Sequence, residues 1–153
     1  KLPQNLIELH CMECNIEELD NLPDSVQILN CKYNLITSLC HLPRSLEKLK
    51  CGENQIIANL ENLPPKLKYL ECMNNKLRNI NNFNSLTELY ISNNNIDDID
   101  NLSSIKILNC VENPIKKIKF FETVNTIVCS TSLLSSKYKI KSINKFNNNH
   151  YLI

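Results

Sequence analysis

Hydrophobic and polar positions recur along this chain with a period of 19–21 residues. The units share the pattern L-x-x-L-x-C-x-x-N-x-I-x-x-L, which is clearest from Leu22 to Leu39. A period in this range is typical of a solenoid, in which every unit packs on its neighbours. Seven units align on their first core position, at Leu6, Val26, Leu46, Leu67, Leu86, Ile105 and Val124.

The L-x-x-L-x-C core of each unit alternates like a short strand. Stacked copies would form a parallel sheet with strands about 4.8 Å apart, so seven of them would make a wall roughly 30 Å long. Four units are preceded by a Leu-Pro pair, and proline lacks an N–H donor and favours extended geometry. We therefore predict about seven repeats, with a parallel sheet on the concave face and mostly extended or 3-10 connections on the convex face.

A second recurring position holds asparagine. A short amide side chain can bond to nearby backbone groups, so in a stack it can tie each turn to its neighbour. The first and last units carry Cys14 and Ser132 in this position, as expected for terminal repeats that have a neighbour on one side only. The predicted structural column is Asn34, Asn54, Asn75, Asn94 and Asn113.

One domain accounts for the whole chain. We interpret residues 1–134 as the solenoid and residues 135–153 as its C-terminal cap and tail. Within that tail, lysines alternate with Tyr138 and Ile140 from Lys137 to Lys141. This period predicts a final strand that shields the open end of the core, with lysines suited to a sheet edge.

Charge and hydropathy exclude several classes of partner. The net charge is +1, which gives no electrostatic reason for binding nucleic acid or an anionic membrane. No apolar run is long enough to span a bilayer, and the N-terminus lacks a signal-peptide core. We expect a monomer in the cytoplasm, either of its own cell or of a host cell.

Eight cysteines raise the question of a metal or redox site. The pair Cys11 and Cys14 has C-x-x-C spacing, but no second pair follows at zinc-finger distance, so we predict no metal. Buried free cysteine behaves as a small hydrophobe. Cys40 lies on a connection and is expected to be the most exposed thiol. Six cysteines share one inward position and are predicted to pack in the core, namely Cys11, Cys31, Cys51, Cys72, Cys110 and Cys129.

Catalytic residues are not evident in the sequence. The three histidines, His10, His41 and His150, fall in different contexts, and a single glycine leaves no phosphate-binding loop. An enzyme would need Cys14 or Cys40 to be activated beside a histidine, and the neighbours Cys40 and His41 equally suit a surface turn. We predict no catalytic residue and no cofactor.

The repeat pattern resembles the leucine-rich repeat over about residues 2–134. Its Leu-Pro-x-x-Leu lead-in, as at residues 63–67, resembles the short repeats of type III secreted bacterial effectors and similar units of giant DNA viruses of amoebae. The last three repeats are more similar to the ordinary intracellular class. The resemblance implies a curved solenoid that binds protein on its concave sheet. Such effectors often carry a cysteine-dependent ubiquitin ligase, but no helical domain of that kind follows here, so no ligase activity is expected.

Outward positions of the central strands supply a candidate binding surface. Tyrosine, methionine and mixed charge suit a protein interface with aromatic anchors, although a solvated sheet face shows a similar mixture. The predicted partner-binding residues are Tyr69, Tyr90, Met73, Lys48, Lys50, Glu71, Glu88, Ile107 and Asn109.

Three hypotheses on function follow from this surface. The leading one is a non-enzymatic module that binds a protein on the concave sheet. The alternative is the substrate-recognition part of a larger enzyme or ubiquitin-ligase assembly, which additional coding sequence upstream of Lys1 would favour. The third is a repeat that has no partner at this face.

Overall fold

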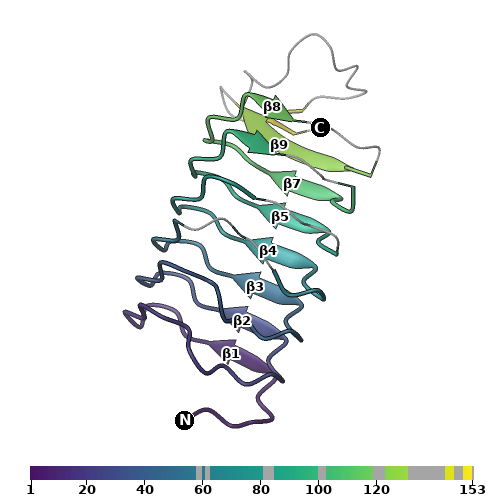
Figure 1. The fold of residues 1–153 in the computed structure, drawn as a ribbon. Helices are drawn as coiled ribbons and strands as arrows, with labels where there is room; N and C mark the ends of the chain where they lie inside the picture. Colours follow the sequence, from purple (N-terminus) through teal and green to yellow (C-terminus); the bar gives the residue numbers. More distant parts are fainter. Residues whose placement is uncertain are drawn as a thin grey trace.

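The computed structural model describes residues 1–57, 60, 63–80, 85–99, 103–118, 123–130, 144–146 and 150–152. The chain winds as a stack of similar turns, each of which contributes one short strand to the same side (Figure 1). This arrangement confirms the predicted repeat solenoid. The seven parallel strands are β1 (Glu8–His10), β2 (Ile28–Asn30), β3 (Lys48–Lys50), β4 (Tyr69–Glu71), β5 (Glu88–Tyr90), β7 (Ile107–Asn109) and β9 (Thr126–Ser130).

The connections behind the sheet are extended. In the described part of the chain no residue is helical, which agrees with the proline-rich lead-ins. Each of these prolines closes a tight turn instead; for example, the Val26 N–H donates to the Pro23 carbonyl at 3.1 Å. Later in the chain the connections form a second parallel sheet of two strands, β6 (Asp98–Ile99) and β8 (Lys117–Ile118).

The hydrophobic core runs along the stack between the sheet and the connections. The middle residue of each inner strand is fully buried, as are the cysteines that follow β2 to β4. Cys11 departs from the prediction, because it is only half-buried. The first turn packs against a neighbour on one side alone, so Leu9 and Ile16 are also only partly buried.

The asparagine column ties each turn to the turn before it. Asn54, for example, accepts the N–H of Ile36 through its Oδ1 atom at 3.0 Å. Its Nδ2 group donates to the carbonyls of Cys31 and Cys51, both at 3.0 Å. One side chain thus satisfies backbone groups of two successive turns in a buried position where water cannot replace it.

Two further columns were not anticipated from the sequence. Ser25, Ser45 and Ser85 donate their hydroxyls to a carbonyl of the preceding turn, at 2.7, 2.7 and 2.9 Å respectively. The residue just before each asparagine adopts a left-handed backbone, with φ between 52° and 56°, at Tyr33, Glu53, Asn74, Asn93 and Glu112.

The C-terminal residues extend the main sheet with reversed strand direction. Strand β11 (His150–Leu152) pairs antiparallel with β9, and β10 (Asn144–Phe146) pairs antiparallel with β11. The strand predicted at Lys137–Lys141 and the expected terminal position Ser132 lie outside the described residues. A search of the described residues for a helix long and apolar enough to cross a membrane finds none.

Candidate functional site

The solvent side of the parallel sheet, which we call the concave face, carries the predicted surface. In β2, β3, β5 and β7 the middle residue is buried while the residues on both sides of it are partly exposed, and in β4 the last residue is buried as well. Strands in parallel register therefore align their outward side chains in columns across the stack. Lys48 is in register with Tyr69, and Tyr69 with Glu88.

Two tyrosines form the centre of this face. The rings of Tyr69 and Tyr90 lie with their centroids 5.4 Å apart and their planes inclined by 38°, a geometry in the favourable range for an aromatic pair. The Tyr69 hydroxyl donates to Glu71 Oε2 at 3.0 Å, and the Tyr90 hydroxyl donates to Glu88 Oε2 at 3.2 Å. Partial burial, together with the neighbouring carboxylates, raises the pKa of both tyrosines.

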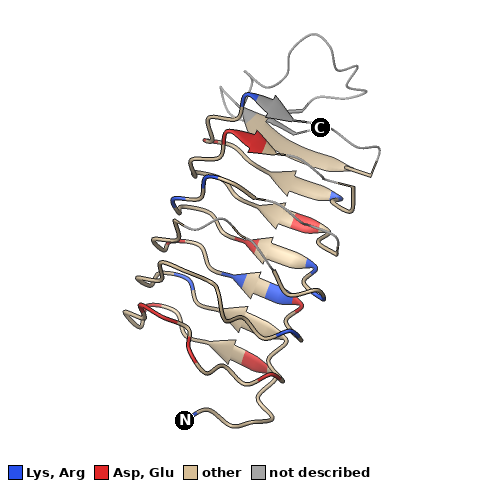
Figure 2. Cartoon of the chain, viewed as in Figure 1, with Lys and Arg blue, Asp and Glu red and all other residues tan. Residues whose placement is uncertain are grey.

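Lysines of β3 flank the aromatic pair. The Nζ atom of Lys48 lies 4.6 Å from the Tyr69 ring centroid, and that of Lys50 lies 5.9 Å from it. Both distances are within the range of cation–π attraction. Figure 2 shows positive charge on β3, with acidic residues on β1 to one side and on β4 and β5 to the other.

Glu71 differs from the prediction, because it is buried and not an exposed contact residue, with 6% of its surface accessible. Its carboxylate is paired with Lys32 Nζ at 2.7 Å and lies 3.7 Å from Lys50 Nζ. Burial alone would raise the pKa of Glu71, but the hydrogen bonds from Lys32 and Tyr69 and the charges of Lys32 and Lys50 outweigh it, so the pKa is lowered.

Lys32 was absent from the predicted site and reaches Glu71 across an intervening strand. It follows β2, whereas Glu71 ends β4. The position between them holds Gly52, the single glycine of the chain. A Cβ atom added at Gly52 would lie 3.8 Å from Lys32 Cε and 3.2 Å from the Met73 carbonyl oxygen. The absence of a side chain at position 52 leaves space for Lys32 to extend past this turn to Glu71. The single glycine is therefore the sequence feature that could have pointed to the contact.

The remaining predicted residues lie around this cluster. Met73 is partly exposed beside Gly52, and Ile107 and Asn109 lie on β7 in register with Glu88 and Tyr90. Asn109 Oδ1 accepts the Ser92 hydroxyl at 2.8 Å. The structure thus joins six of the predicted residues by direct contacts and leaves Met73, Ile107 and Asn109 at the margin.

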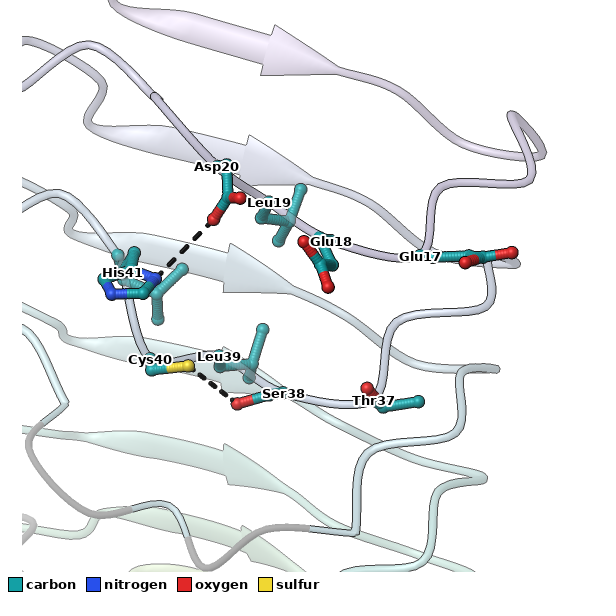
Figure 3. Close-up of a pocket in the computed structure, with 10 residues that line it drawn as sticks. Glu17, Glu18, Leu19, Asp20, Thr37, Ser38, Leu39, Cys40 and His41 are labelled. Carbon is teal, nitrogen blue, oxygen red and sulfur yellow. Dashed lines mark hydrogen bonds and ion pairs between the residues drawn. The ribbon is translucent and has the colours of Figure 1, made fainter.

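A separate pocket of about 200 Å³ lies between the connections of the first two repeats (Figure 3). It contains the Cys40–His41 pair that a catalytic hypothesis would need. The Cys40 thiol lies 2.9 Å from the Ser38 hydroxyl, whereas His41 Nδ1 is directed toward Asp20 at 3.6 Å. The thiol and the imidazole face different partners, so they do not form a nucleophile–base pair.

Metal chemistry has no support in the described residues, in which no group of three or more His, Cys, Asp or Glu side chains is arranged to hold an ion. Cys14 Sγ, the second member of the C-x-x-C pair, instead lies 3.1 Å from the Met12 carbonyl.

Comparison with known proteins finds similarity at the level of structure. No family model matches the chain, and no curated protein sequence matches it. The leucine-rich repeat domain of a Shigella effector is 34% identical, with a TM-score of 0.72 over 77% of this chain and 55% of that one. YopM from Yersinia enterocolitica WA-314 is 25% identical, with a TM-score of 0.69 over 84% of this chain and 34% of that one. The chain therefore spans only part of the length of either structure.

Proposed function

Because the chain is a leucine-rich repeat protein that resembles the repeat domains of bacterial effectors, we propose that it is a protein–protein interaction module without catalytic activity of its own. In this proposal a segment of a partner protein binds along the concave face. The eight cysteines are free thiols, which suits action in a reducing compartment such as the cytoplasm.

The observation that carries the proposal is the Tyr69–Tyr90 pair. Binding energy in protein interfaces concentrates in a few central aromatic or arginine anchors. The two rings lie on β4 and β5, in the middle of the seven parallel strands, and both are partly exposed. Their hydroxyls are held by carboxylates, so the rings are already oriented, and little side-chain entropy remains to be lost when a partner binds.

The same surface would also serve the alternative function, in which the chain recognises substrates for a larger enzyme or ubiquitin-ligase assembly. Both similar structures are longer than the segment that matches, which is the observation in favour of this alternative. The two functions differ in whether the captured partner is modified afterwards.

Affinity capture from the native cell tests the proposal, with the intact parent chain and its variants compared side by side. The double variant Tyr69→Ala/Tyr90→Ala should bind the captured partner at least about 30-fold more weakly, because truncating a hot-spot residue costs about 2 kcal/mol or more. Its melting temperature should remain close to that of the parent. Arg44→Ala, on the exposed turn that precedes β3, is the control and should bind normally.

Hydrogen exchange on the purified complex then locates the interface. Protection should appear at β3, β4 and β5. Normal binding by the tyrosine variant, combined with loss of binding by Arg44→Ala or by the connection variant Lys116→Ala, would place recognition on the other side and overturn the proposal.

A further inference from the structure

The charge balance of the concave face specifies the chemistry of the partner. We infer that the partner segment presents a carboxylate side chain next to an apolar one, with the carboxylate at Lys48 and the apolar group on the Tyr69–Tyr90 pair. This inference rests on the proposed function, because it concerns the same face.

Two of the three lysines in the cluster are already engaged. Lys32 and Lys50 both face the buried carboxylate of Glu71, at 2.7 and 3.7 Å. Lys48 is different: among the described residues no carboxylate lies within 4.0 Å of its Nζ atom. Its neighbours in register are Ile28 on β2 and Tyr69 on β4. Lys48 is therefore a cation between an apolar and an aromatic side chain, where an incoming anion is screened less than in open water.

A hollow of about 310 Å³ lies at this position, lined in part by Ile28, Lys48 and Tyr69 and also by the acidic Glu88. A second lysine of the hollow, Lys68, is paired with Glu47 at 2.8 Å and needs no further partner. The Lys48 ammonium lies over the face of Tyr69, and Ile28 adds an apolar side chain to the lining of the same hollow. A side chain with an alkyl stem and a terminal carboxylate matches an ammonium group that has apolar surface beside it. The adjacent tyrosine rings can then pack against the next apolar side chain of the partner.

A nucleic acid would be the other ligand that combines negative charge with stacking. It would place successive phosphates along the face, where Glu71 and Glu88 interleave with the lysines. Like-charge juxtaposition of this kind opposes binding. A single carboxylate on a peptide needs only the one cation at Lys48. Of these two glutamates it meets only Glu88, which lines the hollow and whose carboxylate already accepts the Tyr90 hydroxyl. A peptide is therefore the ligand that the charges favour.

Titration of the isotope-labelled intact chain with short capped peptides, followed by NMR, tests this inference. The probes are acetyl-Leu-Glu-Leu-amide, the matched peptides with glutamine or lysine at the centre, inorganic phosphate and a short oligouridylate. The glutamate peptide should shift signals of residues 48, 69 and 90 in a saturable manner. It should bind about twofold to fivefold more tightly than the glutamine peptide, as expected for one partly exposed ion pair.

Variants test whether the preference for the glutamate peptide depends on Lys48. Lys48→Gln should abolish the difference between the glutamate and glutamine peptides. The same change at the exposed Lys76, which lies after Asn75 on a connection, should preserve it. Lys48→Glu should reverse the preference and select the lysine peptide.

Each contrary outcome overturns the inference in a recognisable way. Equal binding of the three peptides at residues 69 and 90 would refute the preference for an acid and leave the proposed function intact. Equally strong shifts with phosphate or oligouridylate would show that the anion alone, or a nucleic acid, is the ligand. Absence of any shift on the concave face would also refute the inference, and the capture experiment would then judge the proposed function independently.

Discussion

Replacing Asn75 by alanine tests how successive turns are held together. The Oδ1 atom of Asn75 accepts the N–H of Ile56 at 3.0 Å. Its Nδ2 group donates to the carbonyls of Cys51, Cys72 and Met73 at 3.1, 3.2 and 3.2 Å. All four partners are backbone groups, and the asparagine side chain itself is buried.

The cost of the substitution depends on which of these groups keep another partner. Each carbonyl keeps another donor. The Cys51 carbonyl also accepts from Asn54 at 3.0 Å, the Cys72 carbonyl from Asn94 at 3.0 Å, and the Met73 carbonyl from the Glu53 N–H at 2.9 Å. Within the described part of the chain the Ile56 N–H has no other acceptor, so it would be left unsatisfied next to the core. One buried donor without a partner costs about 1–3 kcal/mol, so we expect a loss of about 2 kcal/mol.

Urea denaturation followed by far-ultraviolet circular dichroism measures this loss. Asn95→Ala is the control, because Asn95 is exposed one position off the column, and it should cost less than about 0.5 kcal/mol. Equal losses at the two positions would refute the role of the column.

Aspartate at position 75 provides a sharper version of the same test. It keeps the acceptor for the Ile56 N–H, but its carboxylate would face three carbonyl oxygens. The charged form is therefore disfavoured in the folded state, so the pKa of the new carboxyl rises on folding and stability falls as the pH increases above about 4. Asn75→Asp should be less stable than Asn75→Ala at pH 7 and should recover at pH 3.5, relative to the parent at each pH. Full stability at pH 7 would contradict the geometry.

Three further predictions concern single positions. A thiol reagent should label the exposed Cys40 quickly in the native protein and spare Cys51 until the chain unfolds. The reason is that the hydrogen bond with Cys72 and burial raise the pKa of the Cys51 thiol. Rapid labelling of Cys51 in the native protein would disprove its place in the core. Tyr33→Asn should raise the free energy of unfolding, measured with urea, by about 0.5–1 kcal/mol, because Tyr33 has φ 55° and asparagine tolerates this backbone better. A lower free energy of unfolding would show that the tyrosine ring contributes more to stability than the backbone strain takes away. Glu71→Gln should be destabilising by about 1–2 kcal/mol at pH 7. Since the folded pKa of Glu71 is lowered from 4.5, that deficit should shrink as the pH falls below 4.5, and a deficit independent of pH would mean that the charge of Glu71 is not what matters.

The fold was predictable because the residue types that determine it recur at a fixed spacing along the sequence. Each unit repeats the same buried positions, so one alignment fixes the strands, their register and the inward side chains together. The left-handed column could not be predicted in this way. Tyrosine and glutamate occupy it as readily as asparagine, and no glycine marks it, so the sequence carries no consistent signal for that backbone.

The candidate site was only partly predictable, because its central contact is not periodic. Alignment places Tyr69 and Tyr90 on adjacent strands and therefore anticipates their proximity. It does not anticipate that Lys32 reaches Glu71, since these residues are separated by 39 positions, about two repeats. A contact across two turns depends on the size of the side chain at the turn between them.

Gly52 lies on the turn between Lys32 and Glu71, and the contact that it permits also involves the Tyr69–Tyr90 pair. Lys32 neutralises Glu71, and Glu71 in turn accepts the Tyr69 hydroxyl. A large side chain at position 52 would compete with Lys32 for this space and leave the buried Glu71 carboxylate with Lys50, at 3.7 Å, as its remaining cation. The departure of one repeat from its neighbours thus allows a charge pair that spans two turns of the concave face. In a repeat protein such departures are where specificity can arise, because the consensus positions are committed to packing the stack.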